Sequence, residues 1–128
     1  MNEDKDEQLF RKYPDLFRHR HDHAHSMMGA GFCCGDGWFD LIDKLLFSIQ
    51  SYPYPKDSPV EVVQVKEKFG GLRFYIEGGD NQVHKLIALA EGESFRICEE
   101  CGCRDDVITG GKFWAKTLCK TCRQASEE

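Results

Sequence analysis

The sequence predicts an α+β fold, in which residues 1–95 form a small antiparallel β-hairpin packed with two helices and residues 96–126 form a separate small module. Two β-rich runs flank a Gly-Gly pair, which is typical of a hairpin. Apolar residues recur at helical spacing on either side of these runs, in 37–50 and 80–93. Two Cys-x-x-Cys pairs follow within 98–122.

The N-terminal part of the body is polar and rich in histidine, and it precedes the first long helix. Residues Glu7–Lys12 predict a short helix that ends at Tyr13-Pro14. The longer helix begins near Asp36, whose side chain can cap it, and ends at Tyr52-Pro53-Tyr54-Pro55. The apolar positions that share one face of this helix are Trp38, Leu41, Ile42, Leu45, Leu46 and Ile49.

The strongest strand pattern covers residues 60–69 and 72–76. With Gly70-Gly71 as a two-residue loop, Lys68 lies directly opposite Arg73 in the predicted hairpin. Like charges in that position are destabilising, so this register predicts a basic face with a use beyond folding.

The second helix follows the hairpin, and Asp80 is its predicted N-cap. It runs to Glu91 or Ser94, after which Phe95 leads into the C-terminal module. The residues expected to share the core of the body are Phe32, Trp38, Phe47, Phe69, Phe74 and Ile76.

Four cysteines in the C-terminal module predict a metal site: Cys98, Cys101, Cys119 and Cys122. Two tight Cys-x-x-Cys turns facing each other complete a tetrahedral site, the usual arrangement for one structural Zn²⁺ in a zinc-ribbon-like module. Gly102 suits the first turn, and Gly110-Gly111 suits the end of a ribbon hairpin. The alternative is a pair of disulfides or unrelated thiols. Because thiolates fill all four positions, the site favours a structural role over catalysis.

The other cysteines give no further site from their spacing. Cys33 and Cys34 are adjacent, and buried packing residues are expected at both positions. Cys103 lies beside the first turn, either as a packing residue or as an alternative ligand.

Composition favours a protein of a reducing compartment, here read as the cytoplasm. The acidic N-terminus is no signal peptide, and no apolar run is long enough to span a membrane. The net charge is −5, but residues 96–126 carry 6 Lys and Arg against 4 Asp and Glu. An acidic body argues against nucleic-acid binding by the whole surface, whereas the basic module permits a local contact.

Two groups of residues are candidates for binding a partner. On the polar face of the hairpin these are Lys66, Lys68, Arg73 and Tyr75. On the ribbon they are Arg104, Lys112, Trp114 and Lys116. Basic side chains interleaved with aromatic ones suit a phosphate backbone or an acidic protein, and the alternative is an ordinary solvated face.

The histidine run is a second metal candidate, formed by His19, His21, His23 and His25. In an extended strand these side chains share one face, where two of them could hold a metal with Cys33, Cys34 or Asp36 as further ligands. The run could also be a pH-sensitive patch or a solvated loop. No catalytic constellation stands out elsewhere in the sequence.

Four stretches of the chain also resemble a group of small proteins of tailed phages and prophages. They are Gly35-Asp-Gly-Trp-Phe-Asp-Leu-Ile42, Val63-Gln-Val-Lys-Glu-Lys-Phe-Gly-Gly-Leu-Arg-Phe-Tyr75, Cys98-Glu-Glu-Cys-Gly102 and Thr117-Leu-Cys-Lys-Thr-Cys122. The resemblance implies a phage-type accessory protein, acting in the bacterial host cell, with a C-terminal zinc-ribbon-like module. It brings no catalytic residues, because the group has no established activity.

These observations lead to three hypotheses of function. The first is a non-enzymatic protein that binds and modulates a host protein or nucleoprotein complex, with inhibition of a bacterial defence system as one form. The second is a nucleic-acid-binding zinc ribbon. The third is a metal-dependent enzyme that uses a His/Cys/Asp site around residues 19–36.

Overall fold

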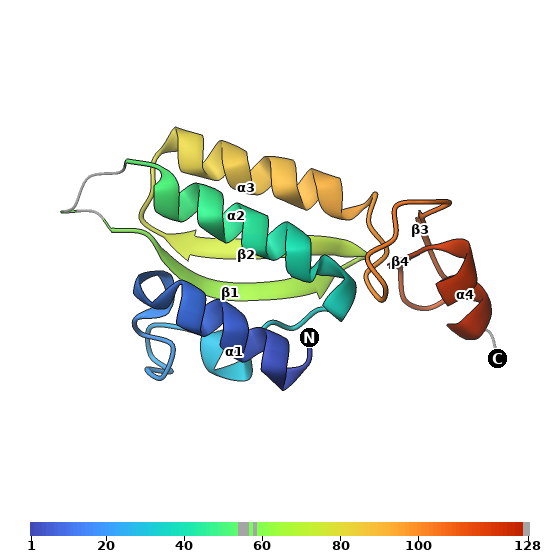
Figure 1. Cartoon of the computed structure of the whole chain (residues 1–128), viewed down its shortest axis with the longest axis horizontal. Coiled ribbons are helices and arrows are strands. Elements are labelled where there is room, and N and C mark those ends of the chain that lie inside the picture. Colours follow the sequence, from blue (N-terminus) through green and yellow to red (C-terminus); the bar gives the residue numbers. More distant parts are fainter. Residues whose placement is uncertain (54–56, 58, 127–128) are drawn as a thin grey trace.

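The structure is a computed structural model that describes residues 1–53, 57 and 59–126, and it confirms the predicted α+β class (Figure 1). Its elements in chain order are α1 (Glu3–Lys12), α2 (Phe39–Ser51), β1 (Glu61–Lys68), β2 (Gly71–Glu77), α3 (Asn81–Ser94), β3 (Ile108–Gly110), β4 (Lys116–Leu118) and α4 (Lys120–Ser126). Short 3₁₀ turns lie at Pro14–Phe17, Met28–Ala30 and Asp36–Trp38. Among the described helices, none combines the length and the apolar character needed to cross a membrane.

The body is built around the antiparallel pair β1–β2. Helix α3 packs on β2, and α2 packs beside α3 (Figure 1). The 3₁₀ turn Pro14–Phe17 that follows α1 packs on β1, and Lys12 of α1 pairs with Asp43 of α2. The second antiparallel pair, β3–β4, forms the ribbon together with α4 at the end of the molecule to which β1 points (Figure 1).

Capping side chains determine where α1 and α3 begin, whereas the cap predicted for α2 is wrong. The predicted short helix extends back to Glu3 because the side chain of Asn2 accepts a hydrogen bond from the Lys5 N–H. Asp80 caps α3 as predicted, accepting the N–H groups of Gln82 and Val83. The expectation that Asp36 caps α2 is wrong, because its carboxylate accepts hydrogen bonds from the backbone and side chain of Asn2 instead.

Helix α2, predicted to begin near Asp36 and to end at Tyr52-Pro53, lies close to these bounds. Helix α2 follows a 3₁₀ turn and ends at Ser51, immediately before the predicted Tyr52-Pro53 stop. Tyr54 and Pro55, which belong to the same predicted stop signal, lie outside the described residues.

The hairpin loop lies one residue earlier than predicted, which shifts the cross-strand partners of residues 64–68 by two residues. The loop is Phe69-Gly70 rather than Gly70-Gly71, and both of its residues have positive φ, 55° and 85°. Two consecutive positive φ values define the turn that matches strand twist, and Gly70 occupies the second of them. Lys68 therefore pairs with Gly71, and the residue opposite Arg73 is Lys66.

Both edges of the β1–β2 sheet are occupied by other parts of the chain. On the outer edge of β2, the Leu72 N–H donates to Ser94 Oγ at 3.0 Å and the Phe74 N–H donates to Glu91 Oε2 at 2.9 Å. On the outer edge of β1, the backbone of Cys33 bonds to Val65 and Glu67. These contacts satisfy backbone N–H and C=O groups that an open sheet edge would offer to another strand.

The core prediction is correct for Phe32, Trp38 and Phe74, which are buried, while Ile76 is partly buried. It is wrong for Phe47 and Phe69, which are 59% and 72% exposed. Phe47 lies off the buried stripe of α2, and Phe69 falls in the turn because of the corrected register.

Candidate metal centre

Four cysteine thiols converge at the base of the ribbon. The Sγ atoms of Cys98, Cys101, Cys119 and Cys122 all lie within 4.8 Å of one another, and those of Cys101 and Cys119 are 3.7 Å apart. A regular tetrahedron with metal–sulfur bonds of about 2.3 Å has sulfur–sulfur distances of about 3.8 Å. The four cysteines are therefore placed to hold one metal ion such as zinc.

A tight turn presents the first pair of thiols. The Gly102 N–H donates to the Cys98 carbonyl at 2.9 Å, and the Cys98 N–H donates to the Cys103 carbonyl at 2.8 Å. Gly102 has a φ of 81°, a conformation that residues with a side chain rarely adopt. This confirms the predicted reason for a glycine directly after the first pair.

The second pair is presented by the start of α4. The backbone N–H of Cys122 is the main cause that lowers the pKa of the Cys119 thiol to about 7. Desolvation is the main cause that raises the pKa of Cys122. Arg123 fixes the geometry, because its guanidinium donates to the carbonyls of Leu118 and Asp106 at 2.7 and 2.8 Å. A bound cation would favour the thiolate form of all four side chains.

The centre is attached to the body through hydrogen bonds that the strand and helix patterns did not predict. The Gly37 N–H donates to the Glu99 carbonyl at 2.7 Å, and the indole N–H of Trp38 donates to the Ile97 carbonyl at 3.0 Å. The Gly35 N–H donates to the Glu99 carboxylate at 2.9 Å, although burial still raises the pKa of that group.

Gly37 is required by this close approach. A Cβ atom at this position would lie 2.1 Å from the Cys98 carbonyl oxygen and 2.6 Å from that of Glu99. The available signal was the pair of glycines before Trp38, which bring the backbone of the body against the first cysteine turn.

The remaining cysteines lie outside the cluster. Cys103 Sγ accepts the Asp105 N–H at 3.2 Å and is not among the four converging thiols. Cys34 is buried as expected, and desolvation raises the pKa of its thiol to about 12. The expectation of burial is wrong for Cys33, whose side chain is exposed beside the edge of β1.

The histidine run is not extended, so its four side chains do not line one face. His19 Nδ1 lies 2.5 Å from Glu61 Oε1, and His25 Nδ1 lies 2.5 Å from Asp22 Oδ2. The rings of these two histidines are 5.9 Å apart. Within the described part of the chain, the four-cysteine cluster is the only group of three or more His, Cys, Asp or Glu side chains with converging ligand atoms.

Of the candidate partner-binding residues, one forms an ion pair within the protein and the others are exposed or half-buried. Arg104 is engaged, since its guanidinium pairs with Glu93 of α3. Lys112, Trp114 and Lys116 are exposed on the ribbon. On the hairpin, Lys68 and Tyr75 are exposed and Lys66 and Arg73 are half-buried.

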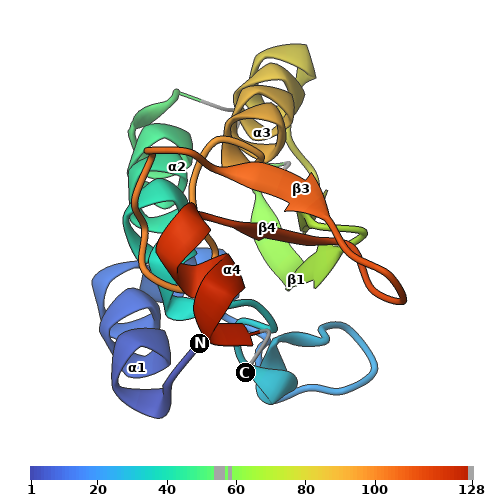
Figure 2. The ribbon, with the colours of Figure 1, turned by 90° about the vertical axis from the view of Figure 1, so that its right-hand side faces the viewer.

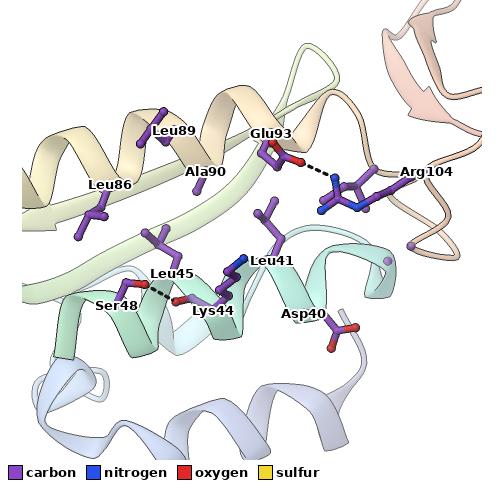
Figure 3. A pocket seen from close by; sticks show the side chains of 13 residues that line it. Asp40, Leu41, Lys44, Leu45, Ser48, Leu86, Leu89, Ala90, Glu93 and Arg104 are labelled. Atoms are coloured by element: carbon purple, nitrogen blue, oxygen red, sulfur yellow. Dashed lines mark hydrogen bonds and ion pairs between the residues drawn. The ribbon is translucent and has the colours of Figure 1, made fainter. Parts of the chain in front are cut away.

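A groove of about 600 Å³ lies between α2 and α3 and reaches the ribbon. Figure 3 shows the residues that line it, with Leu41 and Leu45 on one helix and Leu86 and Ala90 on the other. The Glu93–Arg104 pair closes its ribbon end, so these two charges satisfy each other.

No protein-family model, curated protein or solved structure matches the chain. Its function is therefore inferred from the residues of the metal centre and of the exposed surface.

Proposed function

We propose that the protein is a non-enzymatic, phage-type accessory protein that binds a host protein or nucleoprotein complex in the bacterial cytoplasm and modulates it. Inhibition of a defence system is one form of this activity. One structural Zn²⁺ per chain folds the ribbon, which presents the binding surface.

The closed four-cysteine cluster is the observation that carries this proposal. Four thiolates around one ion leave no coordination position for water or substrate, which favours a structural metal over a catalytic one. Tetrahedral sulfur sites suit zinc or iron, and a site of two short Cys-x-x-Cys turns that closes a small ribbon is typical of structural zinc.

The exposed residues of the ribbon support an interaction role. Phe113 and Trp114 are 84% and 72% exposed on the loop between β3 and β4, which projects outward from the ribbon (Figure 2). Ile108, on β3, is also exposed. Aromatic side chains are enriched at protein interfaces and in nucleic-acid sites, and adjacent exposed ones mark such surfaces.

Affinity capture tests the proposal. The tagged protein is incubated with bacterial lysate with and without nuclease, and bound partners are identified by mass spectrometry and rebuilt from pure components. We expect a discrete partner that is retained by the Phe47→Ala variant, whose exposed phenylalanine lies on α2, and lost by Trp114→Ala. The proposal is contradicted if the natural protein and both variants bind no purified host factor.

A further inference from the structure

The turn of the β1–β2 hairpin packs against the β3–β4 hairpin of the ribbon. The Thr117 hydroxyl of β4 donates to the Gly70 carbonyl in the β1–β2 turn at 2.5 Å. A Cβ atom on Gly70 would lie 2.6 Å from the Thr109 methyl group of β3 and 3.7 Å from the carbonyl carbon of Ala115. The turn that carries Phe69 is thus fixed against the strands that carry the 111–115 loop.

Three large aromatic side chains are exposed on this turn and this loop, which together we call the aromatic end: Phe69, Phe113 and Trp114. Their exposed fractions are 72%, 84% and 72%. Phe69 also holds a φ of 55°, a conformation that bulky residues seldom adopt and that asparagine or glycine normally provides. An apolar ring kept exposed at a strained position is explained by binding rather than by folding.

Basic side chains surround the aromatic end. Lys68 Nζ lies 5.6 Å from the centre of the Phe69 ring, and Lys112 Nζ lies 5.5 Å from that of Phe113. Lys116 pairs with Gly110 at the start of β4, so it borders the same loop. Lys66 shares the face of Lys68 because alternate residues of a strand point to one side.

Among the described residues, these cations form no ion pair. Lys66 and Arg73 lie directly opposite each other, which is unfavourable for two like charges. In the described ranges, no carboxylate lies within 4.0 Å of the charged groups of Lys66, Lys68, Arg73, Lys112 or Lys116. By contrast, Arg18, Arg20, Arg96, Arg104 and Arg123 all form ion pairs. The one acidic residue between the strand lysines, Glu67, accepts the Gly70 N–H at 2.7 Å.

We propose that the aromatic end and its surrounding cations bind single-stranded nucleic acid. Exposed rings provide stacking platforms for unpaired bases, and free lysines and an arginine provide contacts to successive phosphates. Bases inside a duplex cannot stack on such rings, so the surface favours single strands over duplexes. The inference deepens the proposed function, because it names the nucleic-acid part of a nucleoprotein complex as the direct ligand.

The first test measures binding of a fluorescent oligothymidylate of about 20 nucleotides, long enough for a typical site of about 4–16 nucleotides. Up to five phosphate contacts give a slope of log K against log salt of at most about −3.5, at about −0.7 per contact. The double variant Lys112→Gln/Lys116→Gln reduces this slope by about 1.4. The double variant Lys44→Gln/Lys85→Gln on α2 and α3 makes the same change in net charge and leaves the slope unchanged.

The second test separates stacking from charge. Trp114→Ala weakens binding of the oligothymidylate by roughly 5- to 150-fold, the usual effect of removing one stacked ring. Trp114→Phe, which keeps a ring, retains most of the affinity, and Phe47→Ala leaves it unchanged. The chain has two tryptophans, and Trp38 is buried, so quenching of tryptophan fluorescence on binding reports on Trp114.

Three results would overturn the inference. They are absence of binding at low salt, equal affinity for a duplex of the same length, and a loss of affinity in the control variants Lys44→Gln/Lys85→Gln and Phe47→Ala that equals the loss in the test variants. A purified protein partner that is lost on Trp114→Ala, together with no affinity for the oligothymidylate, would make this a protein-binding surface. That outcome refutes the nucleic-acid inference while leaving the proposed function intact. Binding of the oligothymidylate without any host partner would support the nucleic-acid inference and refute the proposed function.

Discussion

Removing the metal is expected to unfold the ribbon and to leave the body folded. The ribbon has two strands of three residues each and a small buried cluster formed by Cys98, Leu118 and Cys119. The body has its own core, which joins α1, α2, α3 and the β1–β2 sheet. The two parts therefore depend on the metal to different degrees.

The magnitudes favour this outcome strongly. Apart from cysteines, Leu118 is the one buried large apolar side chain in the ribbon cluster, and burying a leucine stabilises a fold by about 1.5–3 kcal/mol. Ordering each residue of the module costs about 1–2 kcal/mol in conformational entropy. Zinc binding in comparable small modules contributes about 10–16 kcal/mol. The metal therefore contributes several times as much as the one buried leucine of the ribbon, so its removal is expected to release the ribbon strands and α4.

Hydrogen exchange read by mass spectrometry is the appropriate assay. After treatment with a chelator and a reducing agent, peptides from 98–123 should exchange rapidly, while those from α2, α3, β1 and β2 remain protected. The 35–38 segment should also lose protection, because Gly35 and Gly37 donate hydrogen bonds to Glu99. Elemental analysis of the untreated protein should give one zinc per chain.

Two serine variants provide the control. Cys101→Ser removes a ligand and should reproduce the effect of the chelator, whereas Cys103→Ser changes a cysteine outside the cluster and should retain zinc and protection. Unchanged protection of 98–123 after metal loss would refute the reasoning. So would simultaneous loss of protection in α2 and α3, because the metal would then hold the body as well. Iron in place of zinc would contradict the metal assignment.

Three further predictions concern single residues of the body. Gly37→Ala forces a Cβ against the Cys98 carbonyl and should destabilise the protein by about 3 kcal/mol in thermal unfolding, whereas Gly92→Ala in open space on α3 should stabilise it by about 0.5–1 kcal/mol. The hydrogen bond from the Val83 N–H is the main cause that holds the pKa of Asp80 below its usual range. The ionised Asp80 side chain therefore stabilises the folded state above pH ~4, and this stabilisation is lost as pH falls through the lowered pKa. Asp80→Ala should lower Tm at neutral pH, and its Tm should converge with that of the natural protein in acid; a constant difference would contradict this. Phe69→Asn should raise stability by roughly 1 kcal/mol, because asparagine tolerates positive φ better; lower stability would show that the ring supports the fold.

The fold class and the cysteine site could be predicted because their signals are local. The apolar stripe of α2, the Asp80 cap and the Cys-x-x-Cys spacing within each cysteine pair depend on neighbours a few residues apart. The hairpin register could not be predicted as safely, because Gly70 fits either position of a two-residue loop. The shift of the loop by one residue, and of the cross-strand partners next to it by two, moved Phe69 from the core into the turn.

Long-range contacts explain what the sequence pattern left open. The role of Gly35 and Gly37 depends on Glu99, more than 60 residues away in the chain. The charge on Arg104 suggested a ribbon surface, but its partner is Glu93 on α3. Likewise, His19 is oriented by Glu61, which no spacing rule connects to the histidine run.

Phe69 is the residue at which local preference and observed structure conflict most clearly. The turn needs a residue that tolerates positive φ, the ring gains little burial there, and the ammonium group of Lys68 lies 5.6 Å from the ring centre. Natural sequences agree with their fold at most positions, so a conflict of this kind points to a function that outweighs its cost in stability. If Phe69→Asn gains stability and loses affinity for single strands, the conflict is explained by binding. If it gains stability and keeps the affinity, the stacking surface is confined to Phe113 and Trp114.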